Sequence, residues 1–316
     1  MIKNEEDLVK YILSNINTSS SEIIQSIGDD CSVLKINQKK SYIITTDTSL
    51  LGPHFTKDYK PDEIGYKSLS TNLSDIAAMG CIPKFFLMSI TLPKLDDKWI
   101  KSFYKGVNKL VRQFKLTLIG GDVNKGPLSI TIQVIGVNKN KILYRSMAKI
   151  NDDIYVTGKL GGARAALIFK NNKDNKNYKR FERYLKQPLP RIEIGKEISK
   201  IANSCIDVSD GLLKDLNNII SMSKVGAVIN LEKIPTHSNL KKILKDNLYY
   251  QSIIGGGEDY ELCFTAHTKM RNKIRDVARK TNTKITPIGK ITKKNLLFML
   301  NGLEKKFNFG GFDHFE

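Results

Sequence analysis

Several aspartates of this chain sit beside glycine, serine or threonine where apolar segments are predicted to end. Three such places are Gly28-Asp29-Asp30, Thr45-Thr46-Asp47 and Gly120-Gly121-Asp122. A fourth is Ile206-Asp207-Val208-Ser209-Asp210-Gly211, and Asp75 lies on the polar side of a predicted helix. Carboxylates at buried strand ends are costly unless a cation or a donor compensates them. Hard oxygen ligands without nearby histidine or cysteine suit Mg²⁺, and adjacent glycines let a phosphate approach the backbone.

Each aspartate alone has an ordinary explanation, because aspartate also caps helices and holds turns. Asp210 before Gly211, for example, is a good candidate for a helix cap. Six or seven similar settings in one lysine-rich chain favour a shared site for Mg²⁺ and phosphate instead. The common phosphate motifs are absent from the sequence: there is no G-x-x-x-x-G-K-[ST], no G-x-G-x-x-G and no kinase H-R-D with D-F-G. The predicted site therefore requires another architecture.

The net charge of the 316-residue chain is strongly positive, +19 from 51 Lys and Arg against 32 Asp and Glu. One interpretation is a nucleic-acid or membrane binder. The other, which we favour, is compositional drift, because the lysines are scattered and the densest basic stretch, residues 170–180, is asparagine-rich like a solvated loop. A milder functional interpretation, attraction of small polyanionic substrates, fits both the charge and the predicted phosphate site.

The composition excludes several other classes of protein. No apolar run approaches the roughly 18 residues that span a bilayer, and the first residues are acidic where a signal peptide is basic. The four cysteines form no C-x-x-C pair, which is typical of reduced thiols rather than a zinc site. We expect a cytoplasmic protein with neither a membrane nor a nucleic acid as its partner.

Helices and strands alternate along the chain, and the pattern restarts near residue 150. Predicted helices cover residues 5–16, 61–79, 97–114, 191–203 and 269–281, and one follows Gly211. Predicted strands cover residues 42–46, 85–92, 116–119, 128–137, 142–145, 154–157, 205–208, 227–231, 260–265 and 296–300. This alternation predicts an α/β (α+β) fold of two domains, residues 1–148 and 149–316. The strands 42–46 and 116–119 are expected to stop just before the aspartate motifs.

These motifs together resemble the thiamine-monophosphate kinase family. The two most specific segments are Asn72-Leu73-Ser74-Asp75-Ile76-Ala77-Ala78-Met79-Gly80 and Gly256-Gly257-Glu258-Asp259-Tyr260-Glu261-Leu262. The aspartate motifs above, His54-Phe55 and Gly311-Phe312-Asp313-His314-Phe315 complete a match that runs in order from about residue 26 to 315.

The resemblance implies a fold like that of aminoimidazole ribonucleotide synthetase. Its N-terminal domain would bind ATP and Mg²⁺ and form a homodimer through its strands, and an α/β domain would follow. It also implies transfer of phosphate from ATP to thiamine monophosphate with several Mg²⁺ ions. The implied metal ligands are Asp30, Thr45, Thr46, Asp47, Asp75, Asp122, Asp207 and Asp210. The implied ATP contacts are Tyr104, Gly121, Asp122, Arg145 and Ser209. The implied contacts of the thiamine end are His54, Glu258 and Phe312.

Some of these residues have equally simple structural explanations. Tyr104 lies near the apolar face of its helix and is as well suited to the core. Arg145 ends a predicted strand and is suited to a solvated edge. Phe312 stands where relatives often carry Tyr or Trp, so it keeps the ring and loses the polar group, and it is also suited to anchoring the C-terminus.

Two other classes of function are also compatible with the sequence. Another enzyme of the same fold, of the aminoimidazole ribonucleotide synthetase or selenophosphate synthetase type, would share the aspartate-rich ATP site. A basic nucleic-acid-binding protein would instead carry a clustered basic stripe with interleaved aromatic residues.

Overall fold

The computed structural model describes residues 5–16, 20–37, 40–171 and 175–311. The chain divides into two compact units. Among the described residues, the first comprises those up to Ile76 and Cys81–Lys139, and the second comprises Ala77–Gly80 and residues 140–311. The expected domain boundary between residues 148 and 149 stays a prediction.

The first unit is built on a sheet of six strands in the order β1-β2-β3-β6-β4-β5, counted within the described residues. Neighbouring strands are antiparallel except β4 and β5, which are parallel. Its elements are α1 (Glu5–Asn15), β1 (Ile23–Gln25), β2 (Ser32–Lys35), β3 (Ser41–Leu50), α2 (Pro61–Ala78), β4 (Ile82–Leu92), α3 (Asp97–Phe114), β5 (Thr117–Lys125) and β6 (Ser129–Val137).

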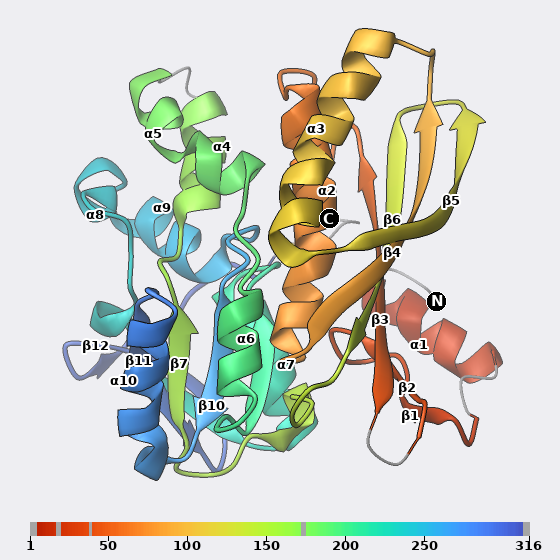
Figure 1. Cartoon of the computed structure of the whole chain (residues 1–316). Helices are drawn as coiled ribbons and strands as arrows, with labels where there is room; N and C mark the ends of the chain where they lie inside the picture. Colours follow the sequence, from red (N-terminus) through yellow and green to blue (C-terminus); the bar gives the residue numbers. More distant parts are fainter. Residues whose placement is uncertain (1–4, 17–19, 38–39, 172–174, 312–316) are drawn as a thin grey trace. The chain divides into compact units, whose positions relative to one another are not determined.

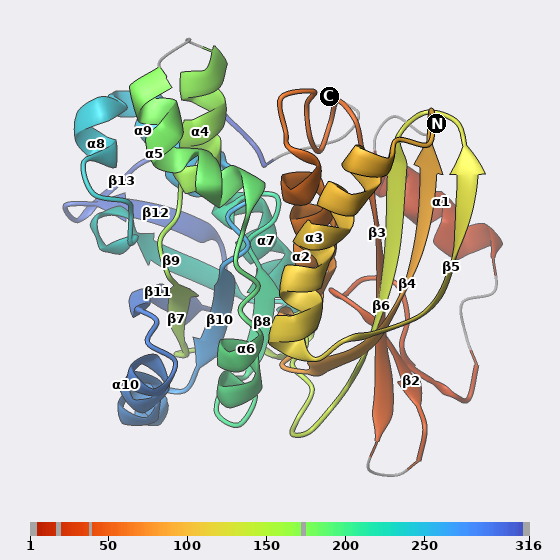
Figure 2. The same ribbon diagram turned by 45° about the horizontal axis from the view of Figure 1, so that its top comes forward.

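Helices α2 and α3 lie against one face of this sheet (Figures 1 and 2). Alternate residues of β6 point toward them, and Ile130, Ile132 and Val134 are fully buried. Helix α3 begins where the Asp96 side chain accepts a hydrogen bond from the Trp99 amide at 3.0 Å. It ends at Lys115, which is left-handed. The face opposite the helices keeps a row of partly exposed side chains.

Two predicted strands of the first unit extend past the aspartates that were expected to end them. Strand β3 includes Asp47, which pairs with Ile132, because β6 offers a ladder along the whole of β3. Strand β5 runs through Asp122, paired in parallel with β4. A side chain at Gly121 would collide with the Met88 carbonyl, so the glycine allows close strand pairing there rather than a stop.

The second unit is built on a sheet of seven strands, among the residues that the structure describes, in the order β13-β12-β9-β11-β7-β10-β8. Only β12 and β9 pair in parallel. Its strands are β7 (Asp153–Thr157), β8 (Ser204–Asp207), β9 (Gly226–Asn230), β10 (Leu262–Ala266), β11 (Ile285–Thr292), β12 (Leu296–Leu300) and β13 (Leu303–Glu304). Its helices are η1 (Arg145–Met147), α4 (Gly162–Asn171), α5 (Asn175–Lys186), α6 (Ile192–Ile198), α7 (Leu212–Ser223), η2 (Leu231–Lys233), α8 (Leu240–Ile243), α9 (Asp246–Tyr250), η3 (Gln251–Gly255), η4 (Thr268–Met270) and α10 (Arg271–Lys280).

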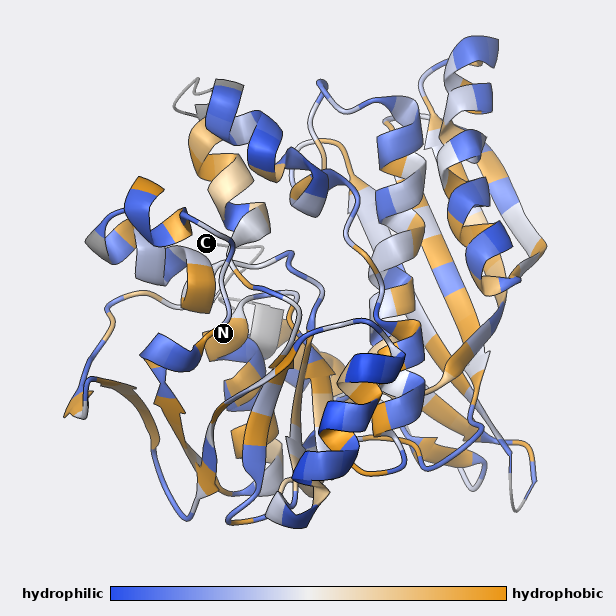
Figure 3. Ribbon diagram, turned by 60° about the vertical axis from the view of Figure 1, so that its left-hand side comes forward, coloured by the Kyte–Doolittle hydropathy of each residue, from blue (hydrophilic) through white to orange (hydrophobic). Residues whose placement is uncertain are grey.

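Strands β7 and β10 form the centre of this unit, and all ten of their residues are buried. The rings of Tyr155 and Phe264 stack across the pair at 5.1 Å. Strand β8 pairs on the other side of β10, which sets Asp207 opposite Leu262 at the end of β8. Most strands are largely hydrophobic, while the helices carry hydrophobic and hydrophilic residues on different sides (Figure 3).

Three expectations for the second half were incomplete or wrong. The predicted strand 142–145 is absent: Leu143 is buried, Tyr144 makes a single bridge to Ser204, and Arg145 begins η1. Part of the lysine-rich stretch read as a loop is helix α5, whose apolar side chains Phe181 and Leu185 are buried. Strand β11 was missed because its pairing is irregular between Pro287 and Gly289, which breaks the alternation of buried and exposed residues.

No helix in the described part of the chain combines the length and the apolar composition needed to cross a membrane.

Candidate active site

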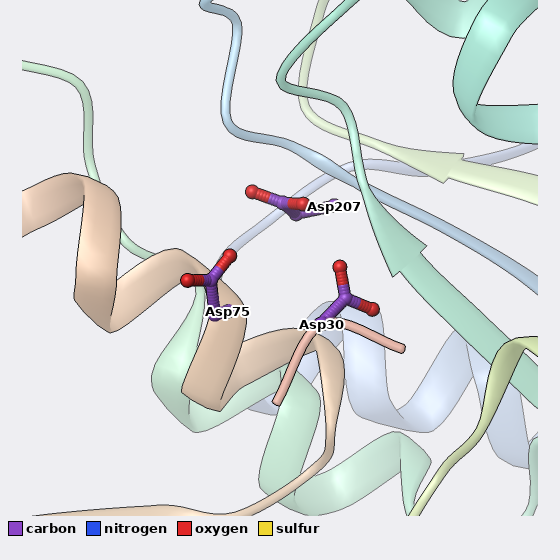
Figure 4. Close-up of side chains that lie close together, drawn as sticks. All are labelled: Asp30, Asp75 and Asp207. Atoms are coloured by element: carbon purple, nitrogen blue, oxygen red, sulfur yellow. The ribbon is translucent and has the colours of Figure 1, made fainter. Parts of the chain in front are cut away.

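Three residues of the first unit bring oxygen atoms together. The Thr45 hydroxyl on β3 donates to Oδ2 of Asp75 on α2 at 2.6 Å. Carboxylate oxygens of Asp30 and Asp75 lie within 4.8 Å of each other, near enough for both to bind one cation after a small adjustment (Figure 4). Asp207, which Figure 4 also labels, ends β8 in the second unit.

These carboxylates create a strongly negative environment. The pKa of the Cys31 thiol is raised well above its ordinary value by burial first, and then by the charges of Asp75 and Asp30. Burial also raises the pKa of Asp47 to about 6, against a hydrogen bond from the Thr71 side chain. A divalent cation would relieve both the repulsion and the cost of burial.

The other predicted residues of the sheet differ in their surroundings. Thr45 and Asp47 point to the same side of β3, whereas Thr46 points to the opposite side, where its hydroxyl accepts from Gln133 at 3.2 Å. Asp122 is exposed and accepts from the Val123 amide at 2.9 Å and from Asn124 at 2.5 Å. The side chain of Thr46 is therefore not brought to Asp75, and its role as a metal ligand stays a prediction.

Two further predicted contacts of the first unit have defined surroundings. His54 follows β3, its Nδ1 accepts from the Leu50 amide at 3.1 Å, and its carbonyl accepts from the buried Lys67 ammonium at 2.9 Å. Because Nδ1 is an acceptor, the neutral ring carries its proton on Nε2. Tyr104 packs edge-on against Phe103 with ring centroids 5.3 Å apart, and burial raises the pKa of its hydroxyl.

In the second unit, the loop between β8 and α7 gathers the remaining acidic residues. Oδ2 of Asp215, in the first turn of α7, accepts from the amides of Asp210 at 3.1 Å and Gly211 at 3.0 Å. The pKa of Asp215 is raised well above its ordinary value by burial and then by Asp210 and Asp207, and Arg145 opposes that rise. The charges of Asp207, Asp210 and Arg145 therefore all act on one buried carboxylate. Asp210 also pairs with Lys214 at 2.9 Å.

Asp215 was not among the residues predicted from the sequence. It holds the loop of the predicted ligands Asp207 and Asp210 in shape, although only 2% of it is exposed. The available signal was an acidic residue in the first turn of the helix after Gly211, a position from which a side chain reaches back to the preceding amides.

The predicted contacts of the second unit adjoin this loop. The Glu258 amide donates to the Ser209 carbonyl at 2.7 Å, so the two residues lie side by side. Arg145 lies in η1, which is joined to α7 because the Arg145 carbonyl accepts from the Ser223 hydroxyl at 2.9 Å. Phe312 lies outside the described residues.

Comparison with known families places both halves of the chain in one class of proteins. Residues 28–138 match the family described as AIR synthase related protein, N-terminal domain. Residues 149–299 match the corresponding C-terminal domain. The chain is therefore an AIR synthase related protein, as the resemblance implied. A solved HypE–HypF complex, 13% identical with a TM-score of 0.74 over 95% of this chain and 98% of that one, shares this fold.

Curated relatives narrow the class. The chain is 42% identical to thiamine-monophosphate kinase of Buchnera aphidicola subsp. Schizaphis graminum, with 99% of each chain covered. It is 36% identical to that of Escherichia coli K12 over 100% of this chain and 99% of the relative. The solved structure of AaThiL complexed with AMPPCP and TMP matches with a TM-score of 0.85 and 29% identity over 98% of this chain and 97% of the other. The chain belongs to the thiamine-monophosphate kinase family, which confirms the resemblance seen in its motifs.

Proposed function

We propose that this chain transfers the γ-phosphoryl group of ATP to the phosphate of thiamine monophosphate, forming ADP and thiamine diphosphate. The observation that carries the proposal is the likeness, along the whole chain, to thiamine-monophosphate kinases and to AaThiL complexed with AMPPCP and TMP. AMPPCP is an analogue of ATP. Carboxylates such as Asp30 and Asp75 in the first unit, and Asp207 and Asp210 in the second, are the kind of ligands that a Mg²⁺–nucleotide complex requires.

The proposed metal ligands come from two places in the sequence, which are considered one at a time. Asp30, Asp75 and the Thr45 hydroxyl fit Mg²⁺ because they are hard oxygen donors crowded together. Asp207 and Asp210 offer the same kind of hard oxygen donor, and both carboxylates act on the buried Asp215. Bound there, Mg²⁺ would neutralise the charge of the phosphates. Thr46, Asp47 and Asp122 stay as further proposed ligands.

Substrate contacts are proposed from the same motifs. Gly121, Asp122, Arg145, Ser209 and Tyr104 are assigned to ATP. His54, Glu258 and Phe312 are assigned to the thiamine end, where a carboxylate suits a cationic thiazolium and a ring suits a flat aminopyrimidine. The Nε2 hydrogen of His54 also makes this side chain a donor.

We infer direct in-line transfer with neither a phosphoenzyme nor a protein base. An oxygen of thiamine monophosphate bonds to the γ-phosphorus while the bond from that phosphorus to the bridging oxygen breaks, and ADP leaves with the electron pair. A phosphate monoester with a second pKa of about 6 is mostly deprotonated at neutral pH, so no base is needed. The main obstacle is repulsion between two polyanions, which the metal-binding carboxylates and the surrounding donors are suited to overcome.

The decisive experiment is a coupled ADP assay with thiamine monophosphate, thiamine and aminoimidazole ribonucleotide precursors side by side. Of these three acceptors, we expect only thiamine monophosphate to support turnover. Turnover with a precursor instead would favour another enzyme of the same fold. Rapid quench with ATP and Mg²⁺ but no acceptor tests the mechanism, since a stoichiometric ADP burst with label on the protein would contradict direct transfer.

We also propose that the enzyme is a cytoplasmic homodimer joined through the first sheet. Ile44 of β3, Ile135 of β6 and Phe85 of β4 are paired in one row across three neighbouring strands. They lie on the face opposite the helices, and Phe85 is 37% exposed. An apolar row on an open sheet face is suited to pairing with a second copy of the chain. The cytoplasmic location is proposed because ATP is the co-substrate.

A further inference from the structure

The segment that carries Glu258 has a backbone that few residues adopt. The φ angle is +69° at Glu258 and +49° at Tyr260, and neither residue is glycine. Left-handed backbone is disfavoured for residues with a side chain, and for bulky ones it is exceptional. Such a conformation persists only where its surroundings hold it, and it is concentrated at functional sites. The contacts of this segment therefore determine where the Glu258 carboxylate points.

Asp259, between these two residues, is fastened to helix α4. Its Oδ2 accepts from the Gly161 amide at 2.7 Å, and its Oδ1 lies 3.4 Å from the Ala163 amide. The Ala163 amide lies in the first turn of the ten-residue helix α4 and the Gly161 amide directly precedes that helix, where the helix dipole favours a negative charge. Burial raises the pKa of Asp259 to about 8, and the backbone hydrogen bonds from α4 oppose that rise.

Glu261 is fastened on the other side of Tyr260. Its carboxylate accepts from the Thr157 hydroxyl at 2.6 Å and from Nε of Arg191 at 2.7 Å, with a second contact to the same guanidinium. It is 5% exposed. Any side chain at Gly158 would collide with this carboxylate, so the glycine leaves the space that Glu261 needs.

We propose that Asp259 and Glu261 are positioning residues that hold Glu258 in its left-handed conformation for recognition of the acceptor. The inference rests on the proposed function, in which Glu258 meets the thiamine end. Backbone hydrogen bonds connect the same segment to the acidic loop: Glu258 donates to Ser209 at 2.7 Å and Tyr260 donates to Val208 at 2.9 Å. The backbone of Glu258 thereby keeps a fixed position relative to the loop that carries Asp207 and Asp210.

The test measures the Michaelis constants for both substrates in Asp259→Ala and Asp259→Asn. The alanine variant loses both acceptor oxygens, and we expect it to raise the KM for thiamine monophosphate by about tenfold or more. The KM for ATP is expected to change by less than about twofold. The asparagine variant keeps one acceptor oxygen and should show a smaller rise. If the alanine variant does not fold, the asparagine variant carries the same comparison.

Asp152 provides the matched control for both substitutions. It is 1% exposed, and its Oδ2 accepts from the Lys149 amide at 3.0 Å and from the Asn203 amide group at 2.8 Å. The same substitutions at Asp152 should lower the unfolding temperature without raising the KM for thiamine monophosphate more than the KM for ATP. An equal rise in the Asp152 variants, or equal effects on both substrates in the Asp259 variants, would reduce Asp259 to a structural role and overturn the proposal.

A double-mutant cycle with Glu258→Gln separates the positioning role from the proposed function. If Asp259 acts through Glu258, the double variant should have nearly the KM of Glu258→Gln alone. Additive effects would overturn the positioning role while leaving the kinase assignment intact. An unchanged KM in Glu258→Gln, in an enzyme that still turns over thiamine monophosphate, would overturn it as well. Absence of turnover in the unaltered protein is a separate readout that contradicts the proposed function.

Discussion

The Thr45 hydroxyl lies 2.6 Å from Oδ2 of Asp75, and this hydrogen bond joins a strand of the first sheet to the helix that covers it. The contact links two positions 30 residues apart and orients an acidic side chain whose oxygens lie near those of Asp30. Asp75 therefore has a fixed direction before any cation is present, which is the property expected of a preorganised ligand.

Asp75→Asn should lower turnover by at least about 100-fold while the protein stays folded, because a neutral amide cannot offset the charge of the metal. The coupled ADP assay and the thermal unfolding curve measure the two effects. Asp62→Asn is the matched control in the same helix, since Asp62 makes a peripheral pair with Lys109 at 3.5 Å. Near-normal activity of Asp75→Asn would count against the metal site.

Asp215→Ala should destabilise the acidic loop of the second unit. Two backbone donors, at Asp210 and Gly211, would lose their acceptor, which costs about 1–3 kcal/mol in the free energy of unfolding. The Mg²⁺ concentration for half-maximal activity should rise as well. Asp276→Ala, at an exposed pair with Arg279, is the control and should change neither quantity appreciably. An unaltered Mg²⁺ requirement in Asp215→Ala would show that the loop holds its shape without this anchor.

The free energy of unfolding should decrease as the pH is lowered from about 6.5 to about 4, because of the buried side chain of His237. Burial, and then the charges of Lys159 and Arg183, lowers the pKa of His237 to about 4. The unfolded chain binds a proton at this residue near pH 6.5 and the folded protein does not, so the stabilisation is complete above that pH. It amounts to about 3 kcal/mol and is lost progressively on acidification.

Denaturant titrations across this pH range measure the effect. His237→Gln should flatten the dependence of the unfolding free energy on pH. The control is His267→Gln, at an exposed helix cap, which should keep the slope of the unaltered protein. Equal slopes for all three proteins would mean that His237 is not kept neutral by its surroundings.

Ile135→Lys should convert the proposed homodimer to a monomer, because it places a charge in the middle of the apolar row with Ile44 and Phe85. Light scattering after size-exclusion chromatography measures the mass directly. The control is Ile24→Lys, at an isoleucine of β1 that is 52% exposed. A monomeric mass for the unaltered chain would contradict the proposal.

Much of the fold was predictable from the sequence, because burial imposes a period on apolar residues. The helix predicted over 97–114 matches α3, and the two-domain α/β class is confirmed. Strand ends were harder to predict. Asp47 and Asp122 were expected beyond their strands and lie inside them, since a neighbouring strand decides where pairing stops.

The candidate site was likewise predictable only in part. Asp30, Asp75, Asp207 and Asp210 stand out by residue type and by their glycine and serine neighbours, so the sequence indicates them. Asp215 and Asp259 act through backbone amides, and only the folded chain shows which amides those are. A motif indicates the proposed ligands more readily than the groups that hold them in place.

Strand β10 lies between β7 and β8, although it follows both of them in the chain. Folding of the second sheet must therefore insert a late segment between two earlier ones, which is a slow, long-range step. During synthesis, Asp207 leaves the ribosome well before Leu262, its partner across the ladder. Until that strand arrives, the earlier strands present unpaired edges that other chains can capture. Activity should therefore be among the last properties to appear on folding, and a truncation before β10 should yield an aggregating fragment.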